Sequence, residues 1–329
     1  MNKNHKNTII YLAAMVVALL LGACSDDMFE EGEQQHSNDR IQLSGDIDQL
    51  AVTRVNDNGF CNGDVMGVYI VDYDGGTPGT LKTSGNRGDN VRHTFDEPNY
   101  RWNSAYDLYW KDKHTHIDVY GYYPFANPES VDDYQFEVKR DQSKPSENGE
   151  MGGYEASDFL WGKVADVAPT TNVIRLPMKH RMANARVTLV EGSGFAAGEW
   201  AGTEKTVLAP NLIRKASINL ADGTVTANGS VEATATMPSR SGNEWRAIVV
   251  PQTVKAGETL FSITIGGVPY KFAKNEAFTY MPGKMSNFSI RVDKKAGSGQ
   301  YQLTLISESI TAWENDLVSH NATAKEYVV

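Results

Sequence analysis

The chain has 329 residues and a formal net charge of −10, which argues against a nucleic-acid partner because phosphate backbones attract basic surfaces. Hydrophobic residues make up 40% and charged residues 22% of the chain, so the composition is that of a globular protein and not of a disordered one. After removal of a leader, the remaining length suffices for two ordinary domains.

The first 23 residues have the pattern of an export signal. Lys3 and Lys6 precede an apolar stretch, residues 9–23, which is shorter than the ~20 residues that a membrane-spanning helix needs. The stretch runs into Leu21-Gly22-Ala23-Cys24, which resembles the lipobox of bacterial lipoproteins, whose cysteine is acylated and becomes the new N-terminus. We therefore expect residues 1–23 to be a signal peptide and Cys24 to carry a lipid anchor. An ordinary secretory signal followed by a chance cysteine is the alternative.

Residues 25–40 are polar, acidic and without periodicity, so they are expected to form a tether. Ser25-Asp26-Asp27 resembles the acidic tag that accompanies transfer of lipoproteins to the outer surface in Bacteroidetes-type bacteria. With Cys24 acylated, Cys61 has no cysteine partner within the chain, and we expect it to be a small buried apolar residue.

From Ile41 onward the hydrophobic pattern has the period of a β-strand, and Ile41, Leu43 and Ile47 share one face. No window after the leader carries a helical stripe, and short strands separated by turn residues favour β-sandwiches. We therefore predict an all-β protein with a domain boundary near residue 170, which gives domains 55–170 and 171–329. The predicted strands are residues 65–71, 117–123, 186–190, 216–220, 245–250, 260–265, 288–292 and 301–306.

Six short stretches follow one another along residues 40–315: Thr53-Arg54-Val55, residues 60–69, residues 102–125, residues 158–162, residues 176–187 and residues 310–313. Together and in this order they resemble the fimbrillin family, the subunits of the type V pili of Bacteroidetes. The resemblance covers most of the chain. It implies a fold of two tandem transthyretin-like β-sandwich domains. It also implies a location at the cell outer membrane and cell surface, in a fimbria.

The resemblance also implies a mode of assembly. In such pilins an N-terminal strand fills a groove of the precursor, an arginine-specific protease removes it, and a C-terminal segment of a neighbouring subunit replaces it. On this pattern Arg54 is the cleaved residue, Val55 is the new N-terminus, and residues 24–54 are the lipidated tether and strand that are lost. Arg40 is a second accessible candidate for cleavage.

The candidate donor segment is residues 300–329, in which Tyr301, Leu303 and Leu305 alternate with polar residues after a flexible joint at residues 296–299. The alternative is that residues 301–306 form the last strand of their own sandwich. The sequence leaves both readings open.

No cofactor, metal or catalytic site is expected. His114 and His116 alternate with Asp112 and Asp118 as a divalent metal site would require, but a solvated polar face is the commoner reason for such a pattern. His180 is expected to be a hydrogen-bonded structural residue. The glycine-rich residues 192–198 precede no clear helix, which argues against a phosphate site. Because no acidic pair is placed for acid/base chemistry, an enzyme is not expected.

The sequence thus favours a structural or adhesive fimbrial subunit whose partners are other fimbrial subunits. The alternative is a non-polymerising surface lipoprotein that binds a glycan or a host protein, because 9 of the 26 residues from Tyr100 to Phe125 are aromatic. This alternative requires that Trp102, Tyr106 and Trp110 are not all buried. The sequence does not distinguish stalk, anchor and tip subunits.

Overall fold

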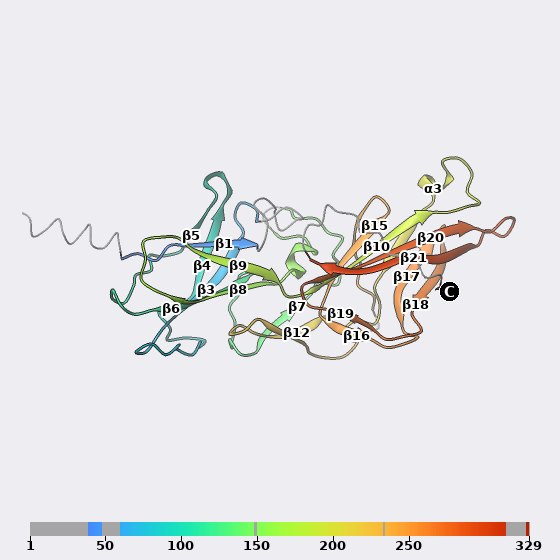
Figure 1. Ribbon diagram of the computed structural model, residues 1–329. Coiled ribbons are helices and arrows are strands. Elements are labelled where there is room, and N and C mark those ends of the chain that lie inside the picture. Colours follow the sequence, from blue (N-terminus) through green and yellow to red (C-terminus); the bar gives the residue numbers. More distant parts are fainter. Residues whose placement is uncertain (1–38, 48–59, 148–149, 233, 314–326, 329) are drawn as a thin grey trace, which may run out of the picture.

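The structure is a computed structural model that describes residues 39–47, 60–147, 150–232, 234–313 and 327–328 (Figure 1). The described residues consist almost entirely of β-strands and turns, which confirms the predicted all-β class. The helical elements among them are single turns: η1 (Glu97–Asn99), η2 (Glu155–Ser157) and α3 (Glu199–Gly202). Within this part of the chain, no helix has the length and apolar content needed to cross a membrane.

The N-terminal half is built on a seven-stranded sheet with the order β1-β9-β8-β6-β3-β4-β5. All of its pairs are antiparallel except the one between β1 and β9. Its strands, in chain order, are β1 (Leu43–Ile47), β3 (Val65–Asp72), β4 (Gly88–Asp96), β5 (Arg101–Ser104), β6 (Ile117–Tyr123), β8 (Leu160–Val167) and β9 (Ile174–His180).

Strand β6 is buried on both of its faces, which places the sheet at the centre of the N-terminal half. Every residue of β6 is buried, and its side chains alternate between two hydrophobic clusters. Val119 and Tyr123 join one cluster, whereas Tyr120 and Tyr122 join the other, as the two-residue period of a strand requires. The sheet is therefore covered on both faces.

The C-terminal half is a sandwich around its own hydrophobic cluster. One layer is a six-stranded sheet with the order β14-β15-β10-β20-β21-β22, and the other consists of the sheets β11-β17-β18 and β16-β19. The strands of the first layer are β10 (Ala183–Glu191), β14 (Ser239–Ser241), β15 (Glu244–Val249), β20 (Lys284–Lys294), β21 (Tyr301–Ala312) and β22 (Tyr327–Val328). Those of the second are β11 (Lys205–Leu208), β16 (Gln252–Val254), β17 (Thr259–Ile265), β18 (Val268–Ala273) and β19 (Phe278–Tyr280).

A small three-stranded sheet joins the two halves, with the order β13-β12-β7. Strand β7 (Tyr134–Glu137) precedes the expected boundary at residue 170, whereas β12 (Lys215–Asn219) and β13 (Thr224–Ala227) follow it. Strand β9 also belongs to the N-terminal sheet, so the chain changes sheets between His180 and Ala183. The division into domains 55–170 and 171–329 stays a prediction.

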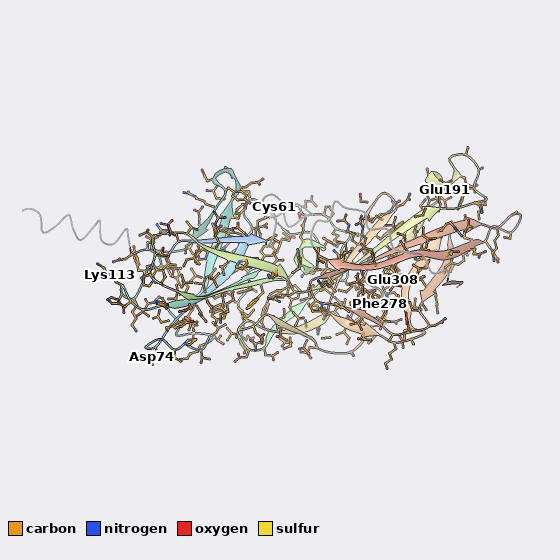
Figure 2. The ribbon with its side chains drawn as sticks, in the orientation of Figure 1. Cys61, Asp74, Lys113, Glu191, Phe278 and Glu308 are labelled. Carbon is orange, nitrogen blue, oxygen red and sulfur yellow. The ribbon has the colours of Figure 1, made fainter. Side chains whose placement is uncertain are left out.

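The side chains of the two halves are drawn in Figure 2, in which Cys61 lies near the top of the N-terminal half and Phe278 and Glu308 lie in the C-terminal half. Cys61 is half-buried and not fully buried as expected, because it lies in the turn that leads into β3. Its backbone N–H donates to Asp64 Oδ2 at 2.6 Å.

Candidate functional site

The feature that stands out as a candidate site is β1, because it forms one edge of the N-terminal sheet. Its strand neighbour is β9, whose residues 174–178 run parallel to residues 43–47. An edge strand can leave a sheet without breaking any other strand pair. β1 is thus separable from the rest of the sheet in a way that the inner strands are not.

Apolar side chains hold β1 against the sandwich. Ile41 and Leu43 are 4% and 6% exposed, and Ile47 packs against the same cluster while partly exposed. Burial of two such side chains contributes roughly 3–6 kcal/mol. Loss of the strand would remove these side chains from the cluster that also contains Met66, Trp102, Leu108, Trp110 and Ile174.

Hydrogen bonds fix the position of this strand from two sides. On one side, Ile174 N donates to Gln42 O at 2.8 Å, next to the parallel pairing with β9. On the other side, Ile41 N donates to Leu108 O at 2.7 Å, and the buried Trp102 Nε1 donates to Gly45 O at 2.9 Å. Trp102 lies on β5, at the opposite end of the sheet order, so the sheet curls until its two end strands, β1 and β5, approach each other.

The predicted lipidation and cleavage residues Cys24, Arg54 and Val55 lie outside the described residues. Arg40 lies within them, just before β1, where it forms an ion pair with Asp107 at 2.6 Å. Its backbone forms a β-bridge with Tyr109. Both the backbone and the guanidinium of Arg40 therefore have partners, although about half of its side chain is exposed.

Tyr301, Leu303 and Leu305 lie in β21, in the opposite half of the molecule from β1 (Figure 1). Leu303 and Leu305 are both 4% exposed and belong to the C-terminal core, and Tyr301 packs against it. β21 pairs with β20 along its whole length. Within one subunit, the structure does not bring the candidate donor residues to the place that β1 occupies in the N-terminal sheet.

An ion pair fastens the middle of β21 to the second layer. Lys274 Nζ lies 2.7 and 2.9 Å from the two carboxylate oxygens of Glu308. Burial acts to lower the pKa of Lys274, but the contacts with Glu308 outweigh it, and the net effect raises the pKa above its usual value. At the end of β21, Trp313 stacks on His180 with ring centres 4.0 Å apart.

The aromatic stretch from Tyr100 to Phe125 is divided between the core and the surface. Trp102 and Trp110 are 7% and 8% exposed, so neither indole face is available to a sugar. Tyr106 is 54% exposed, and Tyr100 and Tyr109 are also exposed. Of the three residues that a glycan site was expected to use, only Tyr106 is therefore accessible.

The four residues of the weak metal candidate form separate contacts. Asp112 accepts hydrogen bonds from Thr115 and from backbone N–H groups, which lower its pKa to about 2. His116 Nδ1 lies 2.7 Å from Asp166, and Asp118 lies 2.8 Å from Lys163 Nζ. Among the described residues, no group of three or more side chains is arranged to hold a metal ion.

Two further sequence features have structural roles. His180 Nδ1 lies 2.9 Å from Asp158 Oδ1, which agrees with the expected hydrogen-bonded histidine. The glycine-rich residues 192–198 lead into α3, which has only four residues, and the loop amide of Ser193 donates to Asp293. The Ser193 N–H, which a bound phosphate would need as a donor, is thus already bonded to a carboxylate.

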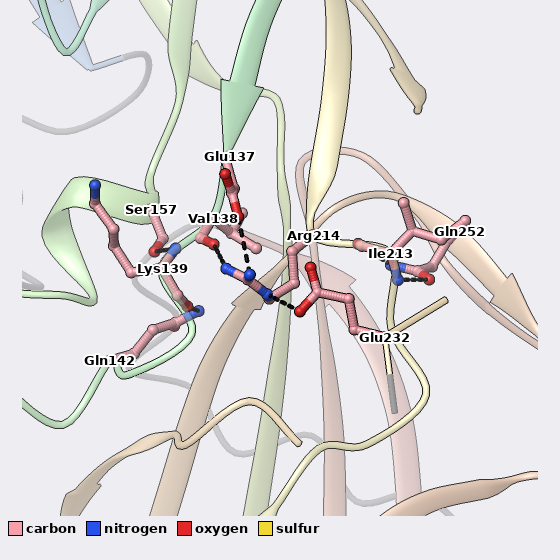
Figure 3. Close-up of polar contacts among 9 residues, drawn as sticks. All are labelled: Glu137, Val138, Lys139, Gln142, Ser157, Ile213, Arg214, Glu232 and Gln252. Carbon is pink, nitrogen blue, oxygen red and sulfur yellow. Dashed lines mark hydrogen bonds and ion pairs between the residues drawn. The ribbon is translucent and has the colours of Figure 1, made fainter. Parts of the chain in front are cut away.

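Polar contacts also lock the junction between the halves (Figure 3). Arg214 lies 2.9 Å from Glu137 and 2.7 Å from Glu232, and its Nη1 donates to Val138 O at 3.0 Å. The hydrogen bond to Glu232 raises the pKa of Arg214 further. Arg214 follows residue 170 and both Glu137 and Val138 precede it, so the guanidinium ties together segments far apart in the sequence.

The fold defines an all-β protein in which β1, the first strand of the described residues, forms one edge of the N-terminal sheet. The chain belongs to the fimbrillin-like family, which it matches over residues 53–313. The matched range begins after β1 and ends just after β21. Membership of this family points to a structural, non-enzymatic protein.

Solved structures share the fold. A candidate cell adhesion protein from Bacteroides uniformis superposes with a TM-score of 0.60 at 16% identity, covering 84% of this chain and 99% of that chain. A candidate cell adhesion protein from Bacteroides ovatus gives a TM-score of 0.59 at 14% identity, covering 84% and 98%. Identities this low establish likeness of fold alone. A comparison with curated proteins found no match.

Proposed function

We propose that this protein is a structural or adhesive subunit of a cell-surface fimbria, anchored in the outer membrane through Cys24 and assembled by exchange of its N-terminal strand. The observation that carries the proposal is the position of β1. It is an edge strand that precedes the family-matched residues 53–313 and is bound to them through side chains and hydrogen bonds. Cleavage between β1 and the body would turn it into a non-covalently held peptide.

The energetics of release support this mechanism. Once cut, β1 would be retained by the roughly 3–6 kcal/mol of burial of Ile41 and Leu43 and by a few hydrogen bonds. Its departure would leave unpaired backbone groups on β9 beside an exposed apolar core, which is a template for an added strand. A neighbouring subunit would provide that strand from its residues 300–329.

The position of Arg40 supports Arg54 as the proposed site of cleavage. A protease needs an extended, accessible segment, whereas the backbone of Arg40 is already paired with Tyr109. A cut after Arg40 would also leave β1 attached to the body. A cut after Arg54 would separate β1 from everything that follows, and Arg54 is therefore the proposed cleavage residue, with Val55 as the new N-terminus.

A second function has one supporting observation. Tyr100, Tyr106 and Tyr109 expose their rings, and exposed tyrosines can stack on sugars or pack against a host protein. A non-polymerising surface lipoprotein that binds such a ligand is the alternative. Burial of Trp102 and Trp110 makes it the weaker of the two.

The test is to treat the intact full-length lipoprotein with an arginine-specific protease, then to sequence the new N-terminus and run an unboiled gel. We expect Val55 as the N-terminus and a ladder of detergent-resistant oligomers. Arg54→Gln should abolish both, and Arg40→Gln is the matched control that should change neither. Cleavage without oligomers would indicate a tip subunit, and resistance to cleavage would contradict strand exchange.

A further inference from the structure

The core-facing side of β1 has a glycine where the alternation calls for an apolar side chain. Ile41, Leu43 and Gly45 all face the core, and Gly45 is itself buried. Its backbone is not among the positive-φ conformations that only glycine adopts easily. Glycine inside a strand is unfavourable, so its presence indicates a place where another group approaches the backbone closely.

The approaching group is the side chain of Met66. A Cβ atom at position 45 would lie 2.9 Å from Met66 Sδ, 3.4 Å from Met66 Cε and 3.5 Å from Trp102 Nε1. Met66 is fully buried in the centre of the sheet, so its thioether cannot turn into solvent to make room. Because these atoms are the far end of a flexible side chain, an alanine would require only a small shift of the thioether, whereas a branched side chain would require a larger displacement within the core.

The backbone cannot retreat from this contact either. Trp102 Nε1 donates to Gly45 O, and the indole is buried. If the strand moved away from the core, this N–H group would lose its acceptor. A buried N–H group without an acceptor is unfavourable. Met66 and Trp102 therefore fix how close the strand lies and how small its residue must be.

We propose that Met66 and Trp102 form the specificity-determining point of the groove, and that the strand bound there must have the pattern apolar-x-apolar-x-small. The inference rests on the proposed strand exchange and adds which strands are accepted. The apolar residues fill the places of Ile41 and Leu43, and the small residue stands over Met66. The Trp102 N–H donates to a backbone carbonyl of the bound strand, so it fixes the register of that strand independently of the strand's side chains.

The occupant that fits is a strand from a second copy of this chain. Leu303, Leu305 and Ser307 repeat the spacing of Ile41, Leu43 and Gly45. Residues 314–329 contain no pair of apolar residues two apart that is followed, after two more positions, by a small one. Within the candidate donor segment, the pattern selects residues 303–307.

The first test needs neither protease nor partner. In the full-length chain, Gly45→Val should lower the melting temperature and expose the amides of β1 to hydrogen exchange. Met66→Ala should also lower the melting temperature, because it leaves a cavity. The double variant should be more stable than the sum of the two losses predicts, since valine would fill the space of the methionine. Additive losses, or an unchanged Gly45→Val protein, would overturn the inference.

The second test offers peptides to the protease-treated full-length subunit and measures their affinity by calorimetry. The peptide of residues 41–47 and that of residues 301–307 should both bind, and residues 315–321 should not. Gly45→Val in the first peptide should weaken binding about tenfold or more, and Met66→Ala in the subunit should restore it. Equal binding of the glycine and valine peptides would overturn the size rule and leave strand exchange intact. If the peptide of residues 41–47 itself fails to bind, the proposed function fails.

Discussion

Strands β1 and β21 have the same local sequence pattern and opposite positions in the fold. Each presents two apolar residues two positions apart and then a small residue. β1 has five residues and one strand neighbour, to which it runs parallel. β21 has twelve residues, pairs with β20 along its length and also with β22, and is held to the second layer by the Lys274–Glu308 ion pair. Position in the sheet, and not sequence pattern, separates a detachable strand from an integral one.

The comparison also limits how exchange can occur. Departure of β1 breaks one strand pairing, that with β9, together with the hydrogen bond from Trp102 to Gly45 O and the contacts with the loop that contains Leu108. Departure of residues 303–307 would remove Leu303 and Leu305 from the C-terminal core. Donation of that segment is therefore favourable only if the groove of the neighbour restores about as much burial as the donor's own core loses.

The largest expected effect comes from truncation of the integral strand. Leu305→Ala should lower the free energy of unfolding by about 2–5 kcal/mol, because it leaves a cavity in a closed core. Leu43→Ala, in the edge strand, should fall at the lower end of that range, since β1 can detach while the rest of the sheet stays folded.

Urea unfolding measures the global loss in each variant, and hydrogen exchange shows where the chain opens. Leu43→Ala should raise exchange in β1 and leave β20 protected. Ile310→Ala serves as the control on β21, because Ile310 is 43% exposed, and it should change stability by less than about 0.5 kcal/mol. Equal and global exchange in both leucine variants would contradict the distinction between the strands.

A smaller effect is expected at the junction between the halves. Arg214→Met should reduce stability by about 1–3 kcal/mol, because it leaves Glu137 and Glu232 without their shared partner and removes a hydrogen bond to Val138 O. If the junction couples the halves, the single unfolding transition should broaden or split in calorimetry. Arg246→Met is the matched control, because Arg246 forms an ion pair with Glu244 on its own strand, β15. If both variants lose a similar amount of stability and their unfolding transitions change in the same way, Arg214 does not couple the two halves.

The smallest effect is a pH dependence that belongs to the N-terminal half. His93 is 2% exposed, its Nδ1 donates to Val91 O at 3.0 Å, and burial lowers its pKa. Above pH ~6.5 the ring is neutral in both the folded and the unfolded chain. As the pH falls below that value, the unfolded chain binds a proton that the folded chain does not, so stability decreases by at most about 1.4 kcal/mol per pH unit. The loss levels off below the folded pKa.

Melting temperatures between pH 7.5 and 5.5 measure this dependence. Asp64 also lies in this half, and burial raises its pKa. The informative quantity is therefore the difference between the wild type and His93→Asn, which keeps a donor and cannot titrate. The variant should lose less stability than the wild type on acidification. Parallel curves for the two proteins would show that His93 is not the titrating group.

Strands with strong alternation could be predicted from the sequence, and β17 and β20 are examples. Strand β9 is not among the strands predicted from the sequence, and it contains Pro177, a residue that inside a run argues against a strand. The structure explains the exception: β9 pairs with β8 only through Lys179 and His180, so the missing N–H of Pro177 interrupts no pair there. β4 was missed because its core positions include His93 and Gly88, which carry no apolar signal.

The candidate groove could be predicted only in part. Ile41, Leu43 and Ile47 were recognised as one face of a strand, and both buried leucines of β21 were recognised as alternating. Met66 and Trp102 were not recognised as parts of the same site, since they lie on β3 and β5 and approach β1 only after the sheet has curled. The one available signal was Gly45, a glycine at a core position of an alternating strand.

The sequence by itself determined the all-β class, the order of the strongest strands and the family resemblance, because strand periodicity and turn residues are local properties of the chain. Only the tertiary structure decided that β1 is an edge strand parallel to β9, that β7 pairs with β12 across the two halves, and that Gly45 faces Met66. These three features depend on which distant segments meet when the apolar faces are buried, and no short stretch of sequence carries that information.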